Sequence, residues 1–455
     1  MRGGVYLSIR QVLGIVVGIW GVLFLTKTIG PGAYGLYSAA LGIYLYIYQI
    51  FRLGIGVYLI RGEKELPVIE FHQAFCCLFL LGILGTIIGI LILPVLKLWV
   101  SLDGLVAIIF VLLLMLPLHL LTAVPIAIIE RALNYRYIAL IETGGQILYY
   151  LIALPMALGG FGAWAPVTGW WMQHIAVFIM VLVASKYRPK FIWDWTIIGR
   201  MGRYGLSFSS SIWVWQLRSL VNPLVVGRLL GAECVGYVAL AIYIVESLSF
   251  VKDVTWRLSI AAMARLQNDK ARLARVIGEG MLLQVTLLGL ILVFFTVGVI
   301  WLLPLYLGKI WYPVITIFPF IALSYLTNSL FNLHSSALYV IHRNWEVTLF
   351  HLFHIAMFTG GVILLIPNMG LLGYGVAEVI ALPSYWLIHY YVRVNIGTIK
   401  YKSALIPYFG LVLPLFYREL GLWTFIGITI IMLWPNTFRT LRKEMVNIRG
   451  GQVEK

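Results

Sequence analysis

Four polar residues recur along one face of an otherwise apolar segment near the middle of the chain. Ser207, Ser211, Arg218 and Asn222 fall within a sector of about 60° when this segment is drawn as an α-helix. Arg218 stands near the centre of the segment, where an unpaired charge in a bilayer costs roughly 2.5–3.5 kcal/mol on insertion scales. The stripe predicts an anion contact in a water-filled cavity. A structural ion pair between Arg218 and a carboxylate on another helix is the alternative.

The next apolar segment carries acidic residues on a shared helical face. Glu246 and Asp253 are seven residues apart, and Lys252 adjoins Asp253. Arg257, four residues beyond Asp253, is placed to form a local ion pair with it. Glu246 has no such partner on its own segment, so we expect it to be a protonatable or cation-coupling carboxylate.

The sequence lacks the common catalytic and metal-binding patterns. It has no phosphate-cradling glycine loop with Lys and Ser or Thr, and no His-Glu-x-x-His motif. Three cysteines do not make a disulfide framework. His351 and His354 share a helical face, but packed or hydrated histidines explain this pair better than a metal does. We therefore predict a protein that is not an enzyme and has no cofactor or metal.

The composition places these residues in a membrane. Hydrophobic residues make up 62% of the 455 residues and charged residues only 11%, a ratio that excludes a water-soluble domain. A hydrocarbon core of about 30 Å requires about 20 apolar residues per helix. We therefore expect an all-α integral membrane protein with twelve spans and two weaker ones. The expected spans are 5–26, 34–60, 74–96, 105–129, 138–158, 162–185, 204–227, 235–256, 280–305, 312–339, 347–366 and 371–392, followed by 403–417 and 420–438.

The basic residues predict the orientation of these spans. Loops on the cytoplasmic side accumulate Lys and Arg. Counting from a cytoplasmic N-terminus, most of the 33 basic residues fall inside. We expect a multi-pass protein of the inner (cytoplasmic) membrane with both termini in the cytoplasm. The net charge of +16 then reflects topology and attraction to anionic membrane lipid, and predicts no nucleic-acid partner. Only Lys27, Lys97, Arg228, Lys309 and Arg418 fall in outer loops.

A repeated loop indicates that the chain is a duplication. The stretch Lys27–Gly35 returns as Arg228–Gly236, with a cation and two glycines at identical spacing. Duplicated membrane bundles commonly place a transport path between their halves. The repeat predicts an N-terminal six-helix lobe at 1–185 and a C-terminal six-helix lobe at 204–393. Between them lies a basic linker at 186–203, read as an amphipathic interface segment or simply as a topogenic loop, and 394–455 adds the two weaker spans and a basic tail.

These motifs resemble those of Wzx-type polysaccharide flippases. The similarity covers roughly residues 5–393 and is most specific in Gly227-Arg228-Leu229-Leu230-Gly231-Ala232, with Leu53-Gly54-Ile55-Gly56 matching the first half. The resemblance implies the fold of the multidrug, oligosaccharidyl-lipid and polysaccharide exporter superfamily, with two pseudo-symmetric lobes around a central cavity that opens by alternating access. It implies a flippase for undecaprenyl-diphosphate-linked oligosaccharide in polysaccharide biosynthesis. Candidate partners are H⁺ or Na⁺ as coupling ion and a polysaccharide polymerase.

The departures from the family pattern make the interior more positive. Arg52 replaces an acidic residue that the family often has, and Val221 stands where an Asp is common. A positive interior suits a diphosphate, because Arg can hold phosphate oxygens in a bidentate manner. We therefore expect Arg218, Arg52 and Lys252, with Asn222 and Ser211, to bind the diphosphate and sugar.

Two other functions stand as alternatives to the flippase, and the same residues also predict a gate. A cation-coupled multidrug exporter of the superfamily would favour carboxylates in its cavity, and a polysaccharide polymerase or acyltransferase would need a large catalytic loop, which the short outer loops exclude. The repeat places Arg52 and Asp253 at equivalent positions with opposite charge. We expect an Arg52–Asp253 ion pair that closes an inner gate; a local pair between Asp253 and Arg257 is the alternative.

Overall fold

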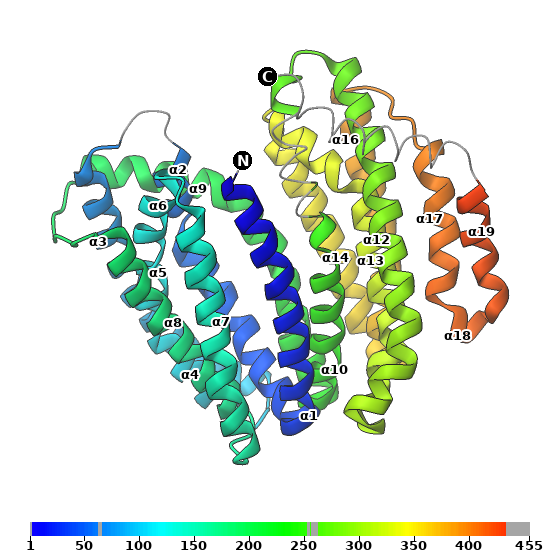
Figure 1. Ribbon diagram of the computed structural model, residues 1–455, viewed down its shortest axis with the longest axis horizontal. Coiled ribbons are helices and arrows are strands. Elements are labelled where there is room, and N and C mark those ends of the chain that lie inside the picture. Colours follow the sequence, from blue (N-terminus) through cyan, green and yellow to red (C-terminus); the bar gives the residue numbers. More distant parts are fainter. Residues whose placement is uncertain (1, 62–65, 253–254, 256–262, 434–455) are drawn as a thin grey trace. The chain divides into compact units, whose positions relative to one another are not determined.

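The computed structural model consists of helices joined by short loops (Figure 1). It describes residues 2–61, 66–252, 255 and 263–433. No strand occurs within these residues, which confirms the predicted all-α class. The chain forms two compact units, Met1–Ala239 and Leu240–Lys455, here called unit 1 and unit 2.

The described part of unit 1 contains nine helices and the beginning of a tenth, together with a short 3₁₀ segment (η1) and a short π-helical segment (η2). They are α1 (Arg2–Arg52), α2 (Ile55–Arg61), α3 (Val68–Trp99), α4 (Leu105–Leu114), α5 (Leu116–Leu121), α6 (Ala123–Arg131), α7 (Tyr135–Leu158), α8 (Trp164–Ser185), α9 (Trp195–Gln216), η1 (Leu217–Leu220), η2 (Asn222–Val226) and the first turns of α10 (Gly227–Leu248).

The described part of unit 2 continues from α10 through longer helices to a shorter C-terminal group. Its elements are α12 (Lys270–Leu307), η3 (Lys309–Trp311), α13 (Tyr312–Val340), α14 (Asn344–Met369), α15 (Leu371–Ile380), η4 (Leu382–Ser384), α16 (Tyr385–Asn395), α17 (Lys402–Leu415), α18 (Tyr417–Leu420), η5 (Leu422–Phe425) and α19 (Ile426–Leu433).

The membrane spans agree with the sequence once two long helices are divided. Within the described residues, nine helices are long and apolar enough to cross a membrane, or ten if α4 and the helices after it, bent by 44°, form one span. Leu13–Arg52 and Ser209–Leu248 hold 40 residues each, about 60 Å of helix and twice the hydrocarbon core. Both are broken near the middle, so each supplies two of the predicted spans. With the bent segment counted as one span, the described helices account for all twelve. The helices α17 and α19 correspond to the two weaker runs.

The two breaks lie at equivalent glycines of the repeat. Gly30 has φ 78° and ψ 169°, and Gly231 has φ 84° and ψ −179°. Residues with a Cβ rarely adopt this positive φ, which glycine reaches at no steric cost. Pro31 follows the first break and starts the next stretch of helix. The same sequence pattern therefore produces the same turn in both copies.

The two copies of the repeat pack against each other within unit 1. A Cβ added to Gly35 would lie 1.7 Å from the carbonyl oxygen of Ala232. At the equivalent position, a Cβ added to Gly236 would lie 2.3 Å from the carbonyl oxygen of Pro31. The contact is reciprocal, because each glycine faces the backbone that precedes the other. Only glycine allows the two backbones to approach this closely.

The linker after α8 is fastened to the start of α3. The Tyr187 hydroxyl hydrogen-bonds His72 Nδ1 at 2.9 Å, and Gln73 Oε1 accepts from the backbone N–H of Asp194 at 2.8 Å. Burial raises the pKa of Tyr187, so its hydroxyl keeps its proton. Phe191 and Trp195 remain 74% and 75% exposed. The segment is hydrogen-bonded to α3 and exposes large apolar side chains, a pattern typical of a segment lying at a membrane interface.

The core of unit 2 is built around α13. In its most apolar stretch 72% of the residues are buried, the largest share among the described spans. Helices α12, α14, α15, α16 and α17 all contact α13. The compact units divide at Ala239, whereas the repeat places the lobe boundary at the linker 186–203. The lobe boundaries therefore stay a prediction from the repeat.

Candidate functional site

The two interior arginines of unit 1 are half-buried and lie beside aromatic rings. Arg52 ends α1, with its Cζ 6.0 Å from the centre of the Tyr48 ring. Arg218 lies in η1, with its Cζ 5.8 Å from the centre of the Trp215 ring. A guanidinium near the face of an aromatic ring is attracted electrostatically. Both cations are thus placed in partly apolar surroundings, where a phosphate would be bound more strongly than in water.

The helical stripe around Arg218 is not regular. A 3₁₀ turn (η1) is followed by a π-helical segment (η2), so the helix tightens and then widens across ten residues. Short π-helical segments occur frequently at functional sites. Asn222, in the π-helical segment, is buried and donates a hydrogen bond from Nδ2 to the carbonyl oxygen of Val235 at 3.2 Å. Its amide therefore fastens η2 to the part of α10 that follows the Gly231 break.

The two serines of the stripe lie on α9, before the segment that carries Arg218. Ser211 is buried, with 7% of its surface exposed. Ser207 lies on the same helix, α9, and its side chain is outside the described part of the structure. A substrate role for Ser211 and Asn222 remains a prediction.

Unit 2 holds Lys252 in a chain of polar side chains. Its Nζ donates to Asn328 Oδ1 at 2.8 Å and lies 4.8 Å from the centre of the Tyr325 ring. Asn328 Nδ2 in turn donates to the Tyr385 hydroxyl at 3.0 Å, which fixes the orientation of the amide so that its oxygen faces Lys252. An ammonium has three N–H donors and can bind several acceptors at once.

Glu246 joins this network through Tyr325. It is exposed, and its Oε1 accepts a hydrogen bond from the Tyr325 hydroxyl at 2.7 Å. Tyr325 therefore contacts both Lys252, through its ring, and Glu246, through its hydroxyl. This arrangement brings the predicted coupling carboxylate and one predicted substrate cation to a single tyrosine.

Three residues of this network were not found from the sequence. Tyr325, Asn328 and Tyr385 are uncharged and lie within apolar helices, so they do not stand out by hydropathy. The one available signal is the spacing of Tyr325 and Asn328, three residues apart and hence on one face of α13.

The predicted inner gate lies partly outside the described residues. Asp253 and Arg257 are not among them. The Arg52–Asp253 ion pair and the local alternative therefore both stay predictions. His354, one of the two histidines considered for a metal, hydrogen-bonds the Ser384 hydroxyl through Nδ1 at 2.8 Å, which is a structural contact between α14 and η4.

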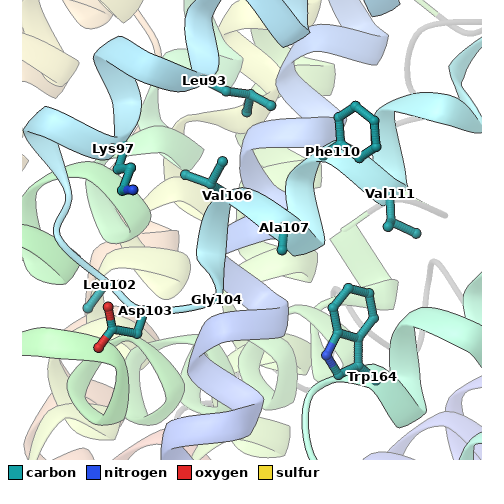
Figure 2. A pocket seen from close by; sticks show the side chains of 10 residues that line it. All are labelled: Leu93, Lys97, Leu102, Asp103, Gly104, Val106, Ala107, Phe110, Val111 and Trp164. Atoms are coloured by element: carbon teal, nitrogen blue, oxygen red, sulfur yellow. The ribbon is translucent and has the colours of Figure 1, made fainter.

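A second cluster lies at the end of unit 1 that carries the Gly30 and Gly231 breaks. The Arg228 Cζ is 3.9 Å from the centre of the Trp99 ring, and its Nη1 donates to the Trp99 carbonyl oxygen at 3.1 Å. Trp99 Nε1 donates to the carbonyl oxygen of Leu224 at 3.1 Å. The cation of the second repeat copy thus binds α10 to the end of α3. A pocket adjoins this end of α3 (Figure 2).

Known proteins share both sequence and fold with this chain. The model of a family described as polysaccharide biosynthesis protein matches residues 24–316. A stretch of 97 residues, 21% of this chain, is 32% identical to the amylovoran biosynthesis protein AmsL of Erwinia amylovora and covers 25% of that protein. The chain thus spans about a quarter of the length of this curated relative.

Two solved structures share most of the fold. The lipid II flippase MurJ, in an inward closed conformation, matches with a TM-score of 0.69 at 14% identity, over 98% of this chain and 99% of that one. An inward-facing multidrug resistance transporter of the MATE family, in the MOP superfamily, matches with a TM-score of 0.62 at 13% identity, over 86% of this chain and 98% of that one.

These identities are too low to carry function, but the similarity confirms the fold of the exporter superfamily that the sequence resemblance implied. The family match covers more than half of the chain. The chain therefore belongs to the polysaccharide biosynthesis protein family and has the all-helical fold of the MOP exporters.

Proposed function

We propose that the protein is a flippase that carries an undecaprenyl-diphosphate-linked oligosaccharide from the cytoplasmic to the outer leaflet of the inner membrane. Its family supports a role in polysaccharide biosynthesis. The observation that carries the proposal is the set of half-buried cations, Arg52, Arg218 and Lys252, in or directly after membrane-spanning helices. A cation inside a bilayer is costly and therefore marks a functional or paired position, and we assign these three to the anionic substrate.

The chemistry of the cations fits a diphosphate. A guanidinium holds two phosphate oxygens through parallel N–H bonds, and an ammonium acts as a point charge. Arg218 and Arg52 provide the first kind of contact and Lys252 the second. The sugar passes through the hydrated interior, while the isoprenoid tail stays in the lipid, where its transfer to water would be very costly.

Glu246 gives this proposal its coupling site. It is exposed, and the Tyr325 hydroxyl donates to its Oε1, so its second oxygen can accept H⁺ or coordinate Na⁺. The same carboxylate favours the second candidate function, a cation-coupled multidrug exporter. That function accounts less well for the three interior cations, which would repel cationic drugs.

The export of polysaccharide by living cells tests the proposal. A strain that lacks the protein is complemented with wild type, Arg218→Lys or Arg218→Ala. We expect full export, partial export and at least tenfold reduced export, respectively, because lysine keeps the charge but loses the bidentate geometry. Arg343→Ala is the matched control, since Arg343 is exposed and pairs with Glu346 at the surface.

The outcome separates the two functions. Normal surface polysaccharide in cells that contain Arg218→Ala at the wild-type level would remove Arg218 from the mechanism. Unchanged polysaccharide in the deletion strain, together with raised sensitivity to cationic drugs, would favour the multidrug exporter.

A further inference from the structure

A pocket of about 530 Å³ opens in unit 1 between the end of α3 and the start of α4. It lies apart from Arg52 and Arg218 and has no part in the proposed function. Two helices, the loop between them and the first residue of α8 form its walls. The lining residues are Leu93 and Lys97 of α3, Leu102, Asp103 and Gly104 of the loop, Val106, Ala107, Phe110 and Val111 of α4, and Trp164 of α8.

The lining is charged at one side and apolar at the other. Figure 2 shows the Lys97 ammonium and the Asp103 carboxylate together on one side, with Phe110, Val111 and Trp164 on the opposite side. Both charged side chains are exposed. In the part of the chain that the structure describes, neither makes a hydrogen bond or an ion pair, with each other or with another residue. The pocket thus offers one cation and one anion on the same side of its lining.

The charged residues lie at the end of α3 and just before α4, and apolar residues lie further along α4. Asp103 and Gly104 precede the first turn of α4, and Lys97 lies in the last turn of α3. Phe110 and Val111 lie roughly 9–10 Å further along α4 at 1.5 Å per residue. Trp164 is 40% exposed at the start of α8, and tryptophan is enriched where a membrane meets water. The charges therefore stand at a membrane surface and the apolar wall extends toward the hydrocarbon.

From this arrangement we infer that the pocket binds a membrane phospholipid with a phosphoethanolamine headgroup. Lys97 binds the phosphate, Asp103 accepts hydrogen bonds from the primary ammonium, and the first part of an acyl chain packs on Phe110 and Val111. A phosphocholine headgroup fits less well because its nitrogen has no N–H to donate. A purely anionic headgroup leaves Asp103 without a partner and close to a like charge.

Binding at this place stabilises a structural junction of unit 1. Leu102 lines the pocket and also lies 3.5 Å from the Cβ position of Gly227, the first residue of α10. The loop between α3 and α4 is thus held by α10 on one side and by the lipid on the other. A ligand that binds only the folded state raises stability by mass action.

Native mass spectrometry of the purified protein with defined lipids tests this inference. Protein in detergent is equilibrated with equal amounts of phosphatidylethanolamine, phosphatidylcholine and phosphatidylglycerol, and the retained lipid is counted. We expect wild type to retain phosphatidylethanolamine roughly three- to tenfold over phosphatidylcholine, as one or two charge-assisted hydrogen bonds at a partly exposed site allow. Asp103→Asn should abolish that preference, and Lys97→Gln should weaken retention of all three phospholipids.

Lys309→Gln is the matched control, because Lys309 is an exposed lysine in unit 2 that does not line the pocket. It should leave the preference unchanged. Equal retention of the two zwitterionic lipids by wild type, or an unchanged preference in Asp103→Asn, would overturn the inference. A preference for phosphatidylglycerol that Lys97→Gln removes and Asp103→Asn does not would replace it with an anionic-lipid site.

Discussion

Replacing Gly35 by alanine should destabilise the protein, whereas the same change three residues earlier, at Gly32, should not. In the structure a Cβ at residue 35 would lie 1.7 Å from the Ala232 carbonyl oxygen. Real Cβ contacts are essentially never under 3.0 Å, so the two repeat loops would have to separate by about 1.3 Å. Overpacking of this kind typically costs about 1–3 kcal/mol.

Gly236 and Gly32 provide the comparison for this change. At Gly236 the Cβ would lie 2.3 Å from the Pro31 carbonyl oxygen, so the required shift is about 0.7 Å and the loss should be smaller. At Gly32 the nearest atom, Glu233 Cγ, is at 3.6 Å, an ordinary contact. Alanine in a helix is favoured over glycine by roughly 0.5–1 kcal/mol, so Gly32→Ala should be neutral or slightly stabilising.

The assay is the fraction of monodisperse protein that survives heating in detergent, measured for the three variants and wild type. We expect the lowest apparent Tm for Gly35→Ala, a higher one for Gly236→Ala and a still higher one for wild type. The apparent Tm of Gly32→Ala should equal that of wild type or exceed it. If Gly35→Ala and Gly32→Ala had the same apparent Tm, the reciprocal backbone contact would not exist in the stable state of the protein.

Two further predictions concern topology and the Lys252 network. In intact cells a membrane-impermeant thiol reagent should label wild type and lose most of its signal in Cys234→Ser, because the loop of the second repeat copy is expected outside while buried Cys76 and half-buried Cys77 are expected near the inner face; undiminished labelling of Cys234→Ser would reverse the orientation. Asn328→Ala should impair polysaccharide export more than Asn328→Asp, since aspartate keeps an oxygen acceptor for the Lys252 ammonium; equal export by both variants at equal expression would show that Asn328 does not position Lys252.

The membrane spans and the two turns could be predicted from the sequence because their causes are local. Apolar runs of sufficient length specify the spans, and the glycines at Gly30 and Gly231 mark where the chain must turn. The equal spacing of Gly35 and Gly236 was visible as well. That these two glycines face each other's backbone was not, because this depends on how segments distant in sequence pack.

The candidate site was only partly predictable for a related reason. Arg218 and Glu246 stand out because charge is rare in apolar spans. Asn222 was placed on the same stripe by assuming a regular helix, but the 3₁₀ and π-helical segments around it change the rotation per residue. Its amide Nδ2 donates to the Val235 carbonyl oxygen, a contact that the stripe did not predict. Tyr325 and Asn328 carry no charge, and apart from their spacing of three residues it is their contacts with Glu246 and Lys252 that reveal them.

Lipid transfer by the purified protein tests the central claim most directly. Proteoliposomes are loaded with a fluorescent undecaprenyl-diphosphate-linked oligosaccharide, and the fraction accessible to an external quencher is followed with time. We predict that wild type exposes the labelled lipid at least tenfold faster than empty liposomes, and that Arg218→Ala brings the rate close to the background. A wild-type rate equal to that of empty liposomes, with correctly folded protein and with every candidate coupling gradient imposed, would contradict the assignment of this protein as a flippase.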